Sequence, residues 1–152
     1  MGNICRSPMA EAVLRGKLAA AGLQELVSVD SAGTSSAHRG EAPDPRAQAQ
    51  ARRRGWSLAG QKSRPVVDAD FGRFDWLLAM DRDNLDWLRE HCPEPLQPRL
   101  GLLLPHAPAL GRDEVPDPYY GSVAGFDHAL DLIEPACDGL LRQIRQRLDG
   151  LP

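Results

Sequence analysis

The sequence predicts an α/β fold in which a doubly wound, mainly parallel sheet carries helices on both faces. Short apolar segments typical of buried strands alternate along the chain with segments of helical periodicity. The last helical segment keeps its apolar stripe from Phe126 to Leu148. A length of 152 residues fits a single domain over 1–152. Ligands of such folds bind beyond the carboxyl ends of the strands.

The first half of the chain predicts two helices around one strand. Ser7 followed by Pro8 is typical of a helix start, and the apolar positions recur at helical spacing until Gly22. The segment 26–31, LVSVDS, has the alternation and β-branching of a strand. A second helix is expected over 44–55, between an Asp-Pro start and a glycine.

The second half predicts two buried strands, each followed by a different kind of segment. The apolar run 74–80 is typical of a strand covered on both faces, and Asp81 can cap the helix that follows it. Residues 100–104 form a second apolar run. The proline- and glycine-rich segment 105–122 is expected to be a loop leading into the final helix.

Composition excludes several classes of protein. Hydrophobic residues make up 42% and charged residues 26%, so the chain can build a core. The formal net charge of −3 gives no field that would attract nucleic acid or an anionic membrane. No stretch is long and apolar enough for a membrane span, and the first residues do not resemble a secretion signal, so we expect a cytoplasmic protein. Cys5, Cys92 and Cys137 are then expected to be reduced thiols.

Two segments carry residues suited to phosphate chemistry. Gly2 to Arg6 precede a predicted helix, where successive amides, a guanidinium and the helix dipole can meet one anion. Asp117 lies in the segment DPYYG, and a carboxylate beside proline in a loop suits a general acid. Each segment alone is also common as an ordinary turn.

Together the motifs resemble the low-molecular-weight protein tyrosine phosphatase family. The resemblance covers nearly the whole chain and is carried by GNICRSPMAEAV, SAGT, DPRA, FDWLLAMDRDNL and VPDPYYG, in this order. It implies a four-stranded parallel sheet and the hydrolysis of phosphotyrosine in proteins or in small aryl phosphates, through a cysteinyl-phosphate intermediate. It implies no metal or other cofactor.

The resemblance also implies a role for each matching residue. Arg6 and Asp117 are the catalytic residues, the first holding phosphate oxygens and the second acting as acid and then as base. Ser7 would lower the pKa of the nucleophilic thiol, and Asn3 would brace the loop through hydrogen bonds with Asp81 or Asn84. The phosphate-binding set is Gly2, Asn3, Ile4, Cys5, Arg6 and Ser7, and the substrate rim is His38, Tyr119 and Tyr120.

The sequence departs from the family at its beginning. The family's nucleophile lies six positions before the arginine, one residue before Met1, so both it and the first strand are expected upstream of this chain. Cys5 matches a second loop cysteine that is not the nucleophile. We expect the full polypeptide to begin roughly 8 to 15 residues earlier, enough for one strand. The 152 residues as written are predicted to be inactive.

Two other functions remain open at this point. A phosphate-binding pseudophosphatase would keep Arg6 without a nucleophile, although it would not need Asp117. An arsenate reductase on the same fold would need further cysteines near the loop.

Asp44 and Arg46 of DPRA are interpreted as a helix cap and a structural ion pair, and 52–54 as a solvated arginine run. The oligomeric state is left open.

Overall fold

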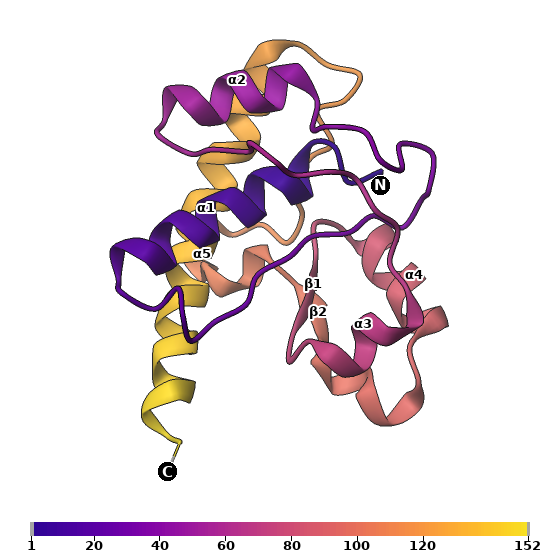
Figure 1. The fold of residues 1–152 in the computed structure, drawn as a ribbon, viewed down its shortest axis with the longest axis vertical. Helices are drawn as coiled ribbons and strands as arrows, with labels where there is room; N and C mark the ends of the chain where they lie inside the picture. Colours follow the sequence, from indigo (N-terminus) through magenta and orange to yellow (C-terminus); the bar gives the residue numbers. More distant parts are fainter. Residues whose placement is uncertain (1, 152) are drawn as a thin grey trace.

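The computed structural model describes residues 2–151 and has the predicted α/β character (Figure 1). Its regular elements are α1 (Arg6–Ala20), α2 (Pro45–Arg53), α3 (Asp68–Arg73), β1 (Leu77–Ala79), α4 (Arg82–His91), β2 (Leu100–Leu102) and α5 (Val123–Asp149), with short 3-10 helices at Glu94–Arg99, Leu104–His106 and Pro108–Leu110. No helix among these residues is long and apolar enough to cross a bilayer.

The sheet is smaller than predicted. In the described part of the chain, β1 and β2 form a two-stranded parallel sheet, in which Leu78 is paired with Gly101. The expected strand at 26–31 is not formed, and nearby only an isolated parallel bridge joins Gly33 to Pro65. A strand exists only when its amides and carbonyls meet a partner, and alternation of side chains does not provide one.

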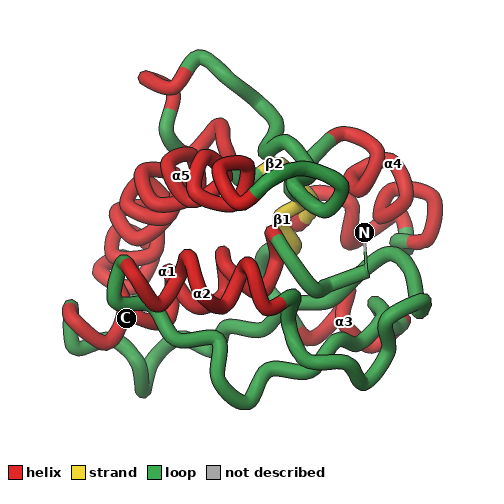
Figure 2. The backbone as a smooth tube through the Cα atoms, turned by 90° about the horizontal axis from the view of Figure 1, so that it is seen from above, coloured by secondary structure: helices red, strands yellow, loops and turns green. Residues whose placement is uncertain are grey.

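Helices cover the two faces of this sheet, as predicted (Figure 2). Leu78 packs against a large core shared by α1, α2 and α5. Leu77 and Ala79 point to the other face and join a smaller core with Phe71, under α3 and α4. The alternation along β1 therefore separates two hydrophobic layers.

Capping explains where most helices begin. Asp44 accepts a hydrogen bond from the Arg46 amide at 2.8 Å, and Asp81 accepts one from the Asn84 amide at 2.8 Å, so both predicted caps are confirmed. The predicted cap of α1 is wrong by two residues, because the helix begins at Arg6 after Cys5 and Ser7 lies inside its first turn. No side chain caps α1, which leaves its first amides available to a ligand.

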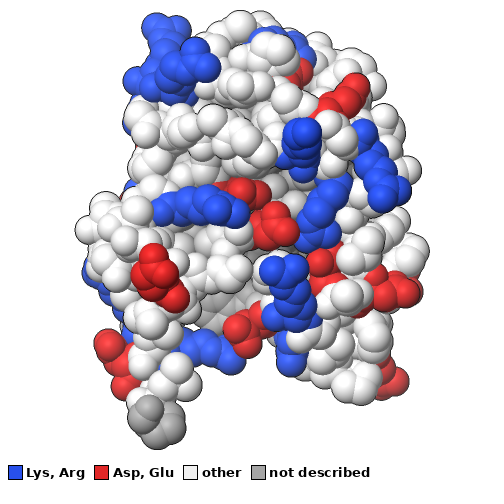
Figure 3. Space-filling view, viewed as in Figure 1, with Lys and Arg blue, Asp and Glu red and all other residues white. Residues whose placement is uncertain are grey.

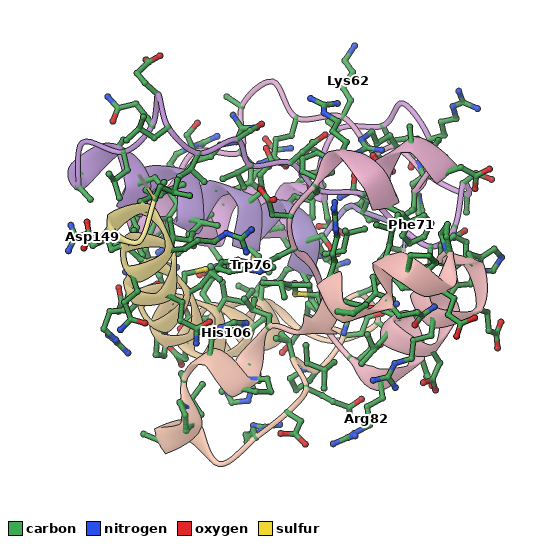
Figure 4. The ribbon with its side chains drawn as sticks, turned by 90° about the horizontal axis from the view of Figure 1, so that it is seen from below. Lys62, Phe71, Trp76, Arg82, His106 and Asp149 are labelled. Carbon is green, nitrogen blue, oxygen red and sulfur yellow. The ribbon has the colours of Figure 1, made fainter. Side chains whose placement is uncertain are left out.

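A hollow of about 570 Å³ lies between α1, α5, β1 and the extended segment 26–33. Figure 3 shows it on the face seen in Figure 1, with uncharged atoms in its depth and charged side chains at its rim. Trp76 lies between α1 and α5 in Figure 4 and lines this hollow, together with Leu78 and Cys137. The hollow therefore borders the edge of β1 that β2 does not occupy.

Candidate active site

All the residues predicted to form the site line one small cavity, about 100 Å³ in volume, at the amino end of α1. The lining residues are Gly2, Asn3, Ile4, Cys5, Arg6, Ser7, His38, Asp117, Tyr119 and Tyr120. The structure thus brings together residues from both ends of the chain. Their roles in binding and catalysis remain predictions.

The loop before α1 is braced by Asn3, whose backbone takes a left-handed conformation with φ of 61°. The buried amide of Asn3 donates to Ser31 Oγ at 2.9 Å and accepts from the Arg64 amide at 3.2 Å. The expected partners Asp81 and Asn84 are therefore wrong, because the side chain points toward the segment after α1. Ser31 in turn donates to Glu11, which ties the loop back to α1.

The guanidinium of Arg6 is buried, with 3% of its side chain exposed. It donates to Asp81 Oδ2 at 2.8 Å and to the Val115 carbonyl at 2.7 Å. Burial acts to raise the pKa of Asp81, but hydrogen bonds from the Asn84 amide and Arg6 outweigh it and hold that pKa below its usual value. The pair orients Arg6 and leaves further N–H groups for an anion.

Asp117 lies beside Arg6 in the lining of the cavity. Its Oδ2 lies 4.0 Å from Arg6 Nη2, and 41% of its side chain is exposed. Asp117 Oδ1 accepts a hydrogen bond from the Tyr119 amide at 3.1 Å, which fixes the carboxyl to the backbone of its own loop. A group bound to Arg6 would therefore have a solvent-accessible carboxyl beside it, as acid–base catalysis requires.

Aromatic rings border the mouth of the cavity. The rings of His38 and Tyr119 are 5.8 Å apart, and Tyr119 meets Tyr120 edge-on at 4.8 Å. Tyr120 is 95% exposed. A Cβ added to Gly2 would lie 2.5 Å from His38 Cδ2, so glycine is what allows the His38 ring to close over the loop.

The three cysteines occupy different environments, and all are free thiols. Burial raises the pKa of the Cys5 thiol to about 12, and the carboxylates of Asp44 and Asp117 add to the rise. A thiol with this pKa stays protonated at neutral pH and is a poor nucleophile. Cys92 packs in the smaller core and Cys137 lines the hollow, so neither borders the small cavity.

Two hydrogen bonds from Arg46 near the site were not predicted from sequence. Arg46 forms the predicted ion pair with Asp44, at 2.8 Å, and also donates to the carbonyls of Tyr119 and Gly121 at 2.9 and 3.1 Å. The sequence carried no signal for the hydrogen bonds to these carbonyls. Every residue has a backbone carbonyl, and these two lie more than 70 positions from Arg46 in the chain.

The arginine run 52–54 is only partly a solvated face. Arg52 and Arg53 are exposed as predicted, whereas Arg54 binds three carboxylates of α5. These are Asp127, Asp131 and Glu134, at 2.6 to 2.8 Å. Arg54 therefore joins α2 to α5.

Comparisons with known proteins find matches over nearly the whole chain. The family model "Low molecular weight phosphotyrosine protein phosphatase" matches residues 1–149. The low molecular weight protein-tyrosine-phosphatase of Streptomyces coelicolor is 43% identical over 152 residues, covering 98% of this chain and 92% of that protein. The Bacillus subtilis relative is 37% identical over 146 residues, covering 96% and 92%.

Solved structures give the same result. A protein tyrosine phosphatase from Entamoeba histolytica, with Hepes in its active site, superposes with a TM-score of 0.93 and 40% identity, covering 96% of this chain and 93% of that one. The tyrosine phosphatase Wzb from Escherichia coli K30, solved in complex with sulphate, superposes with a TM-score of 0.81 and 28% identity, covering 95% and 93%. The chain belongs to the low molecular weight phosphotyrosine protein phosphatase family.

Proposed function

We propose that the protein hydrolyses phosphotyrosine, in proteins or as small aryl phosphates, through a cysteinyl-phosphate intermediate. The observation that carries the proposal is the placement of a buried guanidinium and an exposed carboxyl side by side in the lining of one small cavity, 4.0 Å apart. Arginine suits the equatorial oxygens of a phosphoryl group, and the amides of Gly2 to Ser7 precede or begin a helix. The tyrosine phosphatase Wzb, 28% identical to this chain, was solved in complex with sulphate, which supports oxyanion binding by a protein of this fold.

The reaction would proceed in two displacements. A cysteine thiolate attacks phosphorus, the bond to the phenol oxygen breaks, and Asp117 gives its proton to the leaving phenolate. Water then attacks the same phosphorus, the P–S bond breaks, and Asp117 takes the proton from water. Arg6 and the loop amides hold the charge on the phosphoryl oxygens in both steps.

The thiolate is proposed to come from a cysteine immediately before Met1 in the full polypeptide. Cys5 is not suited to the task, because burial and two carboxylates raise its pKa to about 12. Met1 lies outside the described residues, but Gly2 already lines the cavity, and the proposed cysteine is only two positions before Gly2 in the chain. Ser7 lines the cavity too, and its hydroxyl is proposed to stabilise that thiolate.

The hollow beside β1 is proposed to receive the strand that carries this cysteine. Its walls include apolar side chains of α1, α5 and β1, among them Leu14, Leu78 and Ile144. One long wall is the extended segment 26–33, which would become the fourth strand of a completed sheet. A cytoplasmic location, in which these free thiols stay reduced, is part of the proposal.

The test is to identify the start of the native protein and assay it. In-frame codons upstream of Met1 are expected to encode an apolar strand ending in Cys, and native protein with that segment is expected to hydrolyse p-nitrophenyl phosphate and phosphotyrosine peptides. Replacing that cysteine by serine should abolish turnover and leave phosphate binding intact. An in-frame stop codon directly upstream, or a native mass that starts at Met1, would instead favour a phosphate-binding protein without catalysis.

A further inference from the structure

Arg46 lies outside the anion cavity yet holds the loop that carries Asp117. Its Nη2 donates to the Tyr119 carbonyl at 2.9 Å and its Nη1 to the Gly121 carbonyl at 3.1 Å. Both acceptors are backbone atoms within four residues of Asp117. These bonds therefore restrain the path of the loop whatever side chains it carries.

The other side of Arg46 connects to the phosphate-binding loop. Its Nε and Nη2 donate to the two oxygens of Asp44, at 3.0 and 2.8 Å. The amide of Asp44 donates to the Ile4 carbonyl at 2.7 Å. A chain of contacts thus runs from the loop that carries Ile4, through Asp44 and Arg46, to the loop that carries Asp117.

Aromatic rings hold the guanidinium in this position. Arg46 Cζ lies 4.6 Å from the centre of the Phe126 ring, which is fully buried in the first turns of α5. It lies 5.8 Å from the centre of the Tyr119 ring. Cation–π contacts of this kind orient the planar group as well as attract it.

Asp117 is therefore held between two anchors. Before it, the Val115 amide donates to Met80 at 2.8 Å and the Val115 carbonyl accepts from Arg6. After it, Arg46 holds the carbonyls of Tyr119 and Gly121. Removing the second anchor would free the carboxyl to move away from Arg6, whereas the bond to the Ile4 carbonyl comes from the backbone amide of Asp44 and does not need the Arg46 side chain.

We infer that Arg46 is a positioning residue, which sets the distance between the carboxyl of Asp117 and the leaving oxygen of a phosphate ester bound at Arg6. The inference rests on the proposed function. A proton can be transferred only within hydrogen-bond reach, and displacement of a catalytic group by about 1 Å can cost roughly a hundredfold in rate.

The test replaces Arg46 by Met in the protein with its upstream cysteine. For phenyl phosphates with poor leaving groups, kcat is expected to fall by about ten- to a hundredfold, and by much less for p-nitrophenyl phosphate. Inhibition by inorganic phosphate is expected to stay within about twofold, because it depends on Arg6 and the loop amides. In an Asp117→Asn background the same change should have no further effect, since the acid it positions is gone.

Matched variants separate positioning from general structure. Arg53→Met removes an exposed arginine from the same helix and is expected to leave kcat unchanged for both classes of substrate. Arg46→Lys keeps the charge without the planar fork and should give an intermediate loss. Hydrogen exchange of 115–122 should accelerate in Arg46→Met and not in Arg53→Met, a readout that needs no turnover.

Three results would overturn the inference: an equal loss for both classes of substrate, additive losses in the Asp117→Asn background, or unchanged exchange in 115–122. If the unsubstituted protein hydrolyses no aryl phosphate, the proposed function fails. The exchange experiment then still decides whether Arg46 holds the loop. If Arg46→Met does not fold, Arg46→Lys supplies the same comparison.

Discussion

At the scale of single residues, Asp117 is proposed to protonate the leaving group, whereas Arg6 is proposed to hold phosphate oxygens. The rate lost with Asp117 should therefore depend on the leaving group. Asp117→Asn, in the protein with its upstream cysteine, is expected to slow hydrolysis of esters with poor leaving groups by about two to four orders of magnitude. Activated esters need less help from an acid and should be affected less. Rates across a series of aryl phosphates measure this. Equal slowing across the series would show that Asp117 has a structural role only.

The carboxyl of Asp70 predicts a dependence of stability on pH. Burial acts to raise its pKa, but hydrogen bonds from Arg64 and the Val67 amide outweigh burial and lower it. A lowered pKa in the folded state contributes stability above the ordinary carboxyl value of about 3.9, and this is lost as pH falls through the folded value.

Asp70→Asn should therefore reduce the free energy of unfolding by about 1 to 3 kcal/mol at pH 7. The difference from the unsubstituted protein should shrink as the pH falls below about 4, because the carboxyl is protonated first in the unfolded state and, at lower pH, in the folded state as well. Urea unfolding at a series of pH values measures both effects. A difference that is constant with pH would mean that the charge of Asp70 contributes nothing.

At the scale of elements, the packing of α5 depends on Gly139. A Cβ added there would lie 1.8 Å from the His106 carbonyl oxygen, which is backbone and cannot move aside as a side chain would. Gly139→Ala is expected to lower the free energy of unfolding by about 1 to 3 kcal/mol or more, despite alanine's higher helix propensity.

Gly72 in α3 is the matched control, because nothing lies within 4 Å of a Cβ added there. Gly72→Ala should be neutral or should stabilise the protein by up to about 1 kcal/mol. Thermal melts of the two variants side by side test the contrast. Similar shifts for both would show that α5 moves to accept a methyl group at Gly139.

At the scale of the whole molecule, the hollow beside β1 predicts a weakly stable chain. The free edge of β1 and the extended segment 26–33 both border it, and apolar side chains of α1 and α5 line it. Unpaired strand edges and uncovered apolar surface favour aggregation, and net stabilities are only about 5 to 15 kcal/mol.

The 152 residues alone are therefore expected to melt at low temperature over a broad range, or to aggregate, and to show no phosphatase turnover. Adding the upstream strand with its cysteine should sharpen the melt and restore activity. Calorimetry and an assay on preparations of verified mass make the comparison. A sharp melt with turnover from the 152-residue chain would return Cys5 to consideration as the nucleophile.

Patterns within short segments were enough to predict much of the molecule. Periodicity and capping residues located α2, α4 and α5, because Asp44 and Asp81 act on amides two or three positions away. Six-residue α3 was missed, since so short a helix has no periodicity to detect. The residues around the small cavity were named from motifs, and the structure gathers them in one place.

By itself the sequence determined the class of fold, the residues that could meet a phosphate group and the family they resemble, because those depend on local chemistry and residue identity. Only the tertiary structure decided which groups of the chain form hydrogen bonds with one another. Asn3 binds Ser31 and Arg64 rather than Asp81, the segment 26–31 runs extended without a ladder, and Arg46 reaches backbone carbonyls. Such contacts join groups far apart in the chain, and many of the groups are backbone atoms common to every residue, so no local pattern specifies them.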